Sequence, residues 1–163
     1  MRARKRFGQH FLDDEAVLQQ IEKVVGLRAT DRVLEIGPGH GALTDLLIDA
    51  PAVYKAIEID RDLIPFLRAR HANLDVINAD VLRVDLSEVL DEAVDWRLIG
   101  NLPYNISSPL LAKLTEFVGQ YPQRIADMHF MLQREMAQRL AEKISGTAAK
   151  SSARPWMAMA LSR

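Results

Sequence analysis

The chain has 163 residues, 48% of them hydrophobic, and a formal net charge of −1 at pH 7. This predicts one domain with a sizeable core, and the absence of cysteine excludes disulfides and cysteine-bound metals. No apolar run approaches the ~20 residues that span a bilayer, and the four histidines have no ligand spacing, so we expect a cytoplasmic protein with no membrane or metal partner.

The N-terminal segment is basic, with Arg4, Lys5 and Arg6 within its first six residues. Because the net charge is close to zero, contacts with the phosphates of a nucleic acid would require clustered positive charge. We expect residues 1–12 to form a basic arm that contacts nucleic acid. A solvated terminus is the plainer alternative.

Apolar spacing predicts a helix from Asp13 or Asp14 to about Val25, followed by Gly26. The next element is an apolar strand that begins at Val33. Together they indicate the first helix and strand of an alternating α/β pattern.

A glycine-rich turn with Gly37, Gly39 and Gly41 ends this strand, and residues 42–48 predict a helix. Glycine lets the backbone approach a ligand closely and adopt positive φ. The spacing Gly-x-Gly-x-Gly differs from the dinucleotide pattern Gly-x-Gly-x-x-Gly. The turn therefore indicates a ligand site of another kind, or only a tight connection.

Acidic residues end the next two predicted strands. Glu58 and Asp60 lie at the end of strand 53–59, and Asp80 follows strand 74–79. In nucleotide-binding α/β folds, an acid at the tip of the second strand accepts from ribose hydroxyls. An acid after the third strand can accept from the amino group of an adenine. The alternatives are a helix-dipole partner for Glu58 and a turn residue for Asp80.

Asn101, Leu102, Pro103 and Tyr104 follow a buried strand predicted at 96–100. The amide oxygen of Asn101 and a main-chain carbonyl at Leu102 or Pro103 can accept from an exocyclic amino group on a planar base. Tyr104 offers a face on which that base can stack. We interpret these residues as catalytic; the alternative is an ordinary turn.

The remaining elements continue the alternation. We expect a helix at 61–70 that Pro65 shortens or kinks, and a helix that Ser107 caps and Pro109 opens. A strand at 125–132 and a helix at 133–143 follow. This order predicts a Rossmann-like α/β fold, mainly a parallel sheet with helices on both faces.

Taken together, the motifs resemble the KsgA-type ribosomal RNA adenine dimethyltransferases, a family of class I S-adenosylmethionine-dependent methyltransferases. The resemblance rests on the opening Gly8-Gln9-His10-Phe11-Leu12, the turn from Glu35 to Gly41, and the motif from Asn101 to Tyr104. It implies N6-dimethylation of two adjacent adenosines in small-subunit rRNA during ribosome biogenesis, by direct methyl displacement. The implied partner is this rRNA within the pre-ribosomal small subunit.

The resemblance also assigns roles to individual residues. Those implied to contact the cofactor S-adenosylmethionine are His10, Leu12, Gly37, Gly39, Glu58, Asp80 and Asn101. Those implied to contact RNA are Arg4, Lys5, Arg6 and Tyr104.

Two other functions use the same features. Related sites methylate DNA adenine or a protein glutamine amide, although the opening arm argues against both. A non-catalytic or weakly active assembly factor that binds cofactor and RNA is the second alternative.

The C-terminal segment departs from the family pattern. We expect a basic arm and cofactor lid at 1–12, a methyltransferase core at 13–143, and an atypical, mobile tail at 144–163 with the family's helical domain absent. We also expect a sheet that is incomplete at its C-terminal edge, with Trp156 to Leu161 not replacing the missing strands.

Overall fold

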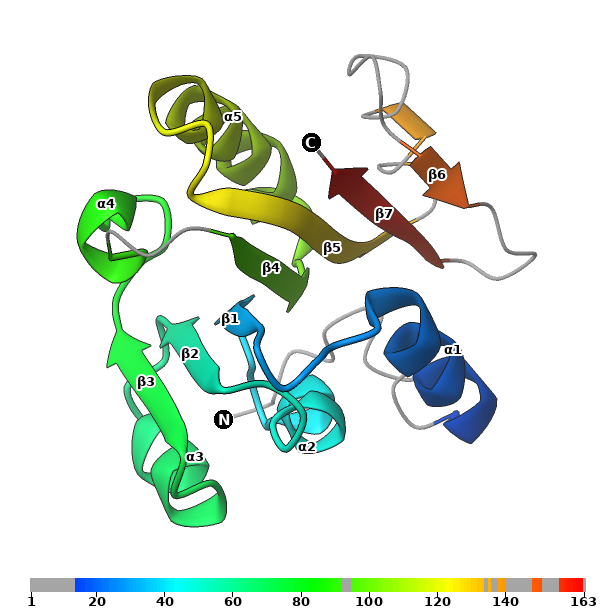
Figure 1. Ribbon diagram of the computed structural model, residues 1–163. Coiled ribbons are helices and arrows are strands. Elements are labelled where there is room, and N and C mark those ends of the chain that lie inside the picture. The colour runs from blue at the N-terminus through cyan, green and yellow to red at the C-terminus, as the bar shows by residue number, and fades with distance from the viewer. Residues whose placement is uncertain are drawn as a thin grey trace.

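The computed structural model describes residues 14–91, 95–133, 135, 138–139, 148–150 and 156–162. The predicted arm at 1–12 lies outside these ranges, as does most of the helix expected at 133–143. Within the described residues the chain forms one sheet flanked by helices on both faces (Figure 1).

The sheet has seven strands in the order β3-β2-β1-β4-β5-β7-β6. The strands are β1 (Arg32–Ile36), β2 (Val53–Glu58), β3 (Leu74–Asn78), β4 (Trp96–Asn101), β5 (Ile125–Gln133), β6 (Ala148–Lys150) and β7 (Trp156–Ser162). β1 to β5 are parallel, which confirms the Rossmann-like core. Strand order reverses between β1 and β4, where open α/β sheets bind ligands.

Five helices pack on the described sheet, in two layers. They are α1 (Glu15–Val25), α2 (Ala42–Leu47), α3 (Ile64–Arg70), α4 (Leu86–Val89) and α5 (Tyr104–Gln120). α4 and α5 share a core with Leu34 and Ile36 of β1, whereas α1, α2 and α3 share another with Val33. Successive β1 residues therefore point to opposite cores, as in a parallel sheet covered on both faces.

Local signals set several helix ends as predicted. The side chain of Asp14 accepts from the backbone N–H of Ala16, and Gly26 ends α1 with a φ of 55°. Pro65 lies in the first turn of α3, which begins at Ile64 and is shorter than the segment 61–70.

The expected start of the helix at Ser107 is wrong. α5 begins at Tyr104 with Pro103 as its N-cap, so that Pro109 lies inside the helix. Pro103 has a φ of −60° and a ψ of 149°, an extended conformation suited to the residue before a helix. The hydroxyl of Ser107 donates to the carbonyl of Pro103 at 3.0 Å, so this serine stabilises the first turn from within.

The expectation of an incomplete C-terminal edge is also wrong. β7 pairs antiparallel with β5 along seven residue pairs, from Asp127 with Ser162 to Gln133 with Trp156. β6 in turn pairs antiparallel with β7. The exposed edge of β5 offers unpaired N–H and C=O groups, and Trp156 to Ser162 satisfies them. The described residues of the predicted mobile tail thus extend the sheet.

Gly100 lets β4 approach β1 closely beside the ligand-binding edge. A Cβ atom at this position would lie 2.8 Å from the backbone oxygen of Ile36, its partner in the parallel register. This contact is with backbone, so the two strands would have to separate.

We expect Gly100→Ala to lower the free energy of unfolding by about 1–3 kcal/mol, the usual cost of overpacking a close-packed site. Urea unfolding measures it. Gly119→Ala is the matched control, because a Cβ there meets no atom within 4 Å. Equal stability of Gly100→Ala and the parent chain would contradict the close-approach account.

None of the helices in the described ranges has the length and apolar character that crossing a membrane requires.

Candidate active site

Four strand ends meet at one edge of the sheet. In the parallel register, Ile36 pairs with Ile57 on one side and with Gly100 on the other, and Glu58 pairs with Asn78. The residues that follow these positions therefore lie along a common edge. This edge brings together the predicted residues Gly37, Glu58, Asp80 and Asn101.

The glycine-rich turn depends on three left-handed backbone conformations. The φ angles are 67° at Gly37, 59° at Gly39 and 87° at Gly41, and other residue types rarely adopt such values. The N–H of Gly37 donates to the carbonyl of Ile57. A Cβ on Gly37 would meet no atom within 4 Å, so backbone conformation requires glycine there and open space remains beside it.

Glu58 ties this turn to the end of β2. Its side chain is buried, and Oε1 accepts from the N–H of Gly39 at 2.8 Å while Oε2 accepts from the N–H of Asp60 at 3.2 Å. Each carboxylate oxygen can accept a second hydrogen bond. Glu58 therefore shapes the turn and keeps the capacity to accept from a ligand hydroxyl.

Glu35 is a second buried carboxyl beneath the turn. Its Oε1 accepts from the hydroxyls of Thr44 at 2.5 Å and Tyr54 at 2.7 Å. Burial raises the pKa of Glu35 to about 7, and the nearby charge of Glu58 acts in the same direction against these hydrogen bonds. Thr44 lies on α2 and Tyr54 on β2, so Glu35 joins the elements that flank the turn.

The raised pKa of Glu35 gives the chain a pH-dependent stability. Native Glu35 keeps its proton at pH values above 4.5, the ordinary pKa of this side chain, so its contribution to stability is greatest below about pH 4.5 and declines towards pH 7. At about 1.4 kcal/mol per pKa unit, the decline approaches about 3 kcal/mol. We expect Glu35→Gln, whose amide oxygen still accepts from both hydroxyls, to remove this decline.

Urea unfolding of both chains between pH 4.5 and 7.5 measures the difference. If the free energy of unfolding depends on pH in the same way for Glu35→Gln and the parent chain, the raised pKa of Glu35 is contradicted.

Asp80 lies in a tight loop between β3 and α4. Its Oδ1 accepts from the N–H of Leu82 at 2.9 Å, and its carbonyl accepts from the N–H groups of Arg83 and Val84. These bonds close one turn and orient the carboxylate.

Asn78 joins the tips of β2 and β3, and none of the sequence motifs predicted it. Its Nδ2 donates to the carbonyls of Glu58 at 2.9 Å and Ile59 at 3.2 Å. A polar amide at the last position of a strand, one residue before the β3–α4 connection, is the signal that indicates such a role.

The Asn101-to-Tyr104 motif connects β4 to α5. The side chain of Asn101 is half-buried, and Leu102 is buried with its N–H donating to the carbonyl of Met131. The carbonyl of Pro103 accepts from the N–H of Ile106 and the hydroxyl of Ser107. Tyr104 is 67% exposed, so its ring is available to a partner.

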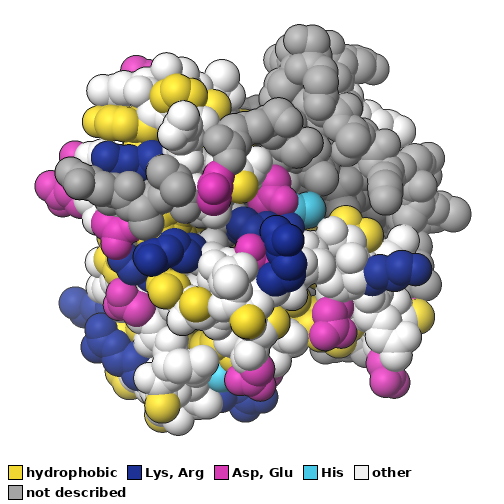
Figure 2. All heavy atoms as spheres, in the orientation of Figure 1, with side chains coloured by type: hydrophobic (Ala, Val, Ile, Leu, Met, Phe, Trp, Pro, Cys, Tyr) yellow, Lys and Arg dark blue, Asp and Glu magenta, His cyan; other side chains and the backbone are white. Residues whose placement is uncertain are grey.

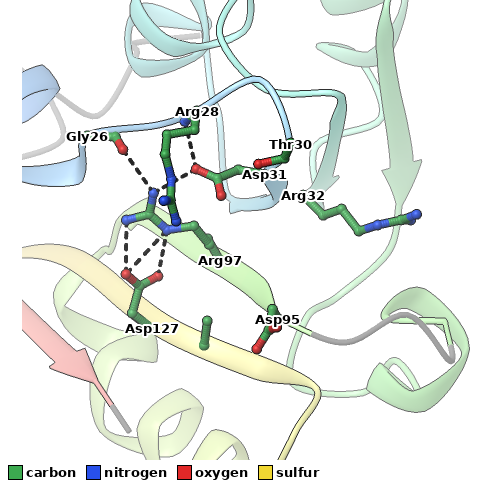
Figure 3. Close-up of a pocket in the computed structure, with 9 residues that line it drawn as sticks. Gly26, Arg28, Thr30, Asp31, Arg32, Asp95, Arg97 and Asp127 are labelled. Atoms are coloured by element: carbon green, nitrogen blue, oxygen red, sulfur yellow. Dashed lines mark hydrogen bonds and ion pairs between the residues drawn. The ribbon is translucent and has the colours of Figure 1, made fainter.

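A cavity of about 590 Å³ lies at the opposite edge of the sheet, where β1, β4 and β5 begin. Figure 3 shows Arg97 between Asp31 and Asp127 on its wall, with N–O distances of 3.0 and 2.9 Å. Burial opposes ionisation of Asp127, but hydrogen bonds from His129 and Arg97 lower its pKa to about 2. The guanidinium of Arg97 also donates to the carbonyls of Val25 and Gly26, so these charges join α1 to the sheet.

Charges of both signs are interspersed over the face in Figure 2, without a large field of one sign among the coloured residues. In the described ranges, no three His, Asp or Glu side chains gather as they do around a metal ion. The predicted arm residues Arg4, Lys5, Arg6, His10 and Leu12 lie outside the described residues, and their roles stay predictions.

The comparisons of this chain with known proteins agree with one another on its family. The sequence model of the family described as ribosomal RNA adenine dimethylase matches residues 1–159. The "Ribosomal RNA small subunit methyltransferase A" of Saccharophagus degradans is 45% identical over 143 residues, which are 86% of this chain and 52% of that protein. Its namesake from Chromohalobacter salexigens is 48% identical over 146 residues, 85% of this chain and 50% of that protein. The chain thus spans about half the length of these curated relatives.

Solved structures show the same fold. The 23S rRNA methyltransferase ErmE has a TM-score of 0.72 at 24% identity, over 92% of this chain and 68% of that one. A dimethyladenosine transferase from Plasmodium falciparum has a TM-score of 0.71 at 24% identity, over 91% and 62%. At this identity the likeness establishes a Rossmann-like methyltransferase fold.

Proposed function

The chain belongs to the ribosomal RNA adenine dimethylase family, and from that premise we propose that it transfers methyl groups from S-adenosylmethionine to adenosine N6 in small-subunit rRNA. The proposed targets are two adjacent adenosines, each of which receives two methyl groups. The observation that carries the proposal is the common edge of Gly37, Glu58, Asp80 and Asn101 at the point where strand order reverses.

The residues at this edge fit the proposed cofactor. The open space beside Gly37 suits a methionine chain that passes close to the backbone. Glu58 has acceptor capacity for ribose hydroxyls, and the oriented carboxylate of Asp80 suits the amino group of adenine. Bound S-adenosylmethionine would supply an electrophilic methyl group on a positively charged sulfur.

Asn101 and Leu102 suit the methyl acceptor. The exocyclic nitrogen of adenine is a poor nucleophile because its lone pair is delocalised into the ring. In the proposed first transfer, the side-chain oxygen of Asn101 accepts from one N–H of that nitrogen and a main-chain carbonyl accepts from the other. This orients the lone pair for in-line attack, and rate is gained through positioning. The nitrogen loses one of these protons as it gains the methyl group, so a single N–H remains to be held in the second transfer.

The hydrogen bonds of the motif favour Leu102 over Pro103 as the carbonyl acceptor. Two donors already occupy the carbonyl of Pro103, at 3.2 Å from Ile106 and 3.0 Å from Ser107. We therefore assign Pro103 to the helix start and the carbonyl of Leu102 to the substrate. The exposed ring of Tyr104 is proposed to stack on the extruded base.

The names of the relatives support rRNA over the other acceptors. Curated relatives of this chain are named as rRNA small-subunit methyltransferases, whereas DNA adenine and protein glutamine are alternatives with no supporting observation. We propose that Arg4, Lys5 and Arg6 contact rRNA, and that His10 and Leu12 contact the cofactor.

Calorimetry with S-adenosylmethionine tests the cofactor part of this proposal. We expect one molecule bound per chain. Absence of binding by the folded chain would contradict both the cofactor and the proposed reaction.

A further inference from the structure

Lys113 connects the middle of α5 to the loop that carries Asp80. Its Nζ donates to the carbonyls of Val81 at 2.9 Å and Val84 at 2.5 Å. These carbonyls belong to the turn that closes through the bonds from Arg83 and Val84 to the carbonyl of Asp80. A single ammonium group thus holds both ends of the turn that follows Asp80.

The surroundings of Lys113 distinguish it from an ordinary surface lysine. It is half-buried at the margin of the apolar face of α5, near the buried Leu110 and Leu114. Burial lowers its pKa, while the negative charges of Asp80 and Asp85 favour its protonated form. Buried donors and acceptors without partners are costly. Loss of the ammonium group would therefore leave the carbonyls of Val81 and Val84 without this donor.

The same helix carries the proposed substrate motif at its start. Lys113 lies nine residues after Tyr104 in α5, or about 13 Å along a rigid helix. The orientation of Asp80 is therefore coupled, through Lys113, to the element that begins at Tyr104.

We propose that Lys113 is a positioning residue for adenine recognition, because it holds the loop in which Asp80 presents its carboxylate to the 6-amino group. This inference rests on the proposed function, in which Asp80 contacts the cofactor's adenine. Lys113 itself does not contact the ligand in this account. We therefore expect substitution of Lys113 to change how well the chain distinguishes ligands with and without the 6-amino group, and not only to change its stability.

The test compares two ligands by calorimetry on the whole chain. One is S-adenosylhomocysteine, and the other is its analogue with hydrogen in place of the 6-amino group. A hydrogen bond to a charged acceptor predicts a roughly ten- to a hundredfold preference of the parent chain for the amino ligand. We expect Asp80→Ala, which removes the acceptor, and Lys113→Met each to reduce this preference to within a few-fold, while Lys113→Arg, which keeps a charged donor, retains most of it.

The outcomes separate the two claims. If Asp80→Ala keeps the full preference, or the parent binds neither ligand, the proposed adenine contact is wrong and the role of Lys113 fails with it. If Asp80→Ala loses the preference but Lys113→Met keeps it, the proposed function stands and the positioning role is overturned. If Lys113→Met weakens the binding of both ligands equally, the positioning role is also overturned, because a merely structural role leaves the ratio of the two affinities unchanged.

Lys113→Gln provides a second variant in case Lys113→Met does not fold. Its amide can donate to one of the two carbonyls, so we expect an intermediate preference in a chain whose folding is verified by circular dichroism. A preference equal to that of the parent chain would count against the proposal.

Discussion

Asn101→Ala is expected to slow methyl transfer by about a hundred- to a thousandfold, the usual effect of removing one preorganised polar group from a reacting centre. Asn101 is the last residue of β4 and is half-buried, so its backbone position is fixed by the sheet. Single-turnover kinetics with saturating RNA measures the rate. We expect little change in the RNA concentration needed for half-saturation.

Two companion variants make this result specific. Asn105→Ala removes the same side chain from an exposed position at the second residue of α5 and should leave the rate unchanged. Tyr104→Ala should instead weaken RNA capture by the roughly 1–3 kcal/mol that base stacking contributes. Normal transfer by a chain that lacks the side chains of both Asn101 and Tyr104 would refute the catalytic assignment.

Glu58→Ala is expected to weaken cofactor binding by about ten- to a hundredfold, because a hydrogen bond to a charged group contributes roughly 1.5–3 kcal/mol. The structure adds a second cause. The carboxylate also accepts from the N–H groups of Gly39 and Asp60, which alanine would leave without this acceptor.

Glu58→Gln separates the two causes, because its amide oxygen can still accept from Gly39. We expect an affinity between those of the parent and Glu58→Ala, measured by calorimetry. Glu22→Gln, at an exposed position on α1, is the matched control and should bind as the parent does. Parent-like affinity in a folded Glu58→Ala would rule out the ribose contact.

The parallel core can be predicted from sequence because its signals are local. Val33 and Leu34 are buried against opposite helix layers, and such short apolar runs followed by glycine or acid indicate strands buried on both faces. The carboxyl ends of parallel strands share one edge, so Gly37, Glu58 and Asn101 can be brought together without coordinates.

The remaining features depend on contacts between distant parts of the chain. The bond from Gly39 to Glu58 joins residues 19 positions apart, and that from Lys113 to Val81 joins residues 32 apart. No local pattern encodes either one. The pairing of β7 with β5 has the same origin, because an available strand edge and not the short segment from Trp156 decides it.

The start of α5 shows how a local signal can mislead. Ser107 and Pro109 have the spacing of a cap followed by a first-turn proline. In the structure, Pro103 precedes the helix and Ser107 donates back to its carbonyl. A residue type that suits a helix start is thus used one turn inside the helix.

The central proposal is that the edge of the sheet where Gly37, Glu58, Asp80 and Asn101 lie directs methyl groups to adenosine N6 in small-subunit rRNA. The most direct test is mass analysis of nucleosides from unmethylated small subunits incubated with the chain and S-adenosylmethionine that carries a deuterated methyl group. We predict N6,N6-dimethyladenosine with two labelled methyl groups, and its loss with Asn101→Ala. Labelled methyl groups on another atom, or no labelled adenosine from a chain that binds the cofactor, would contradict the account.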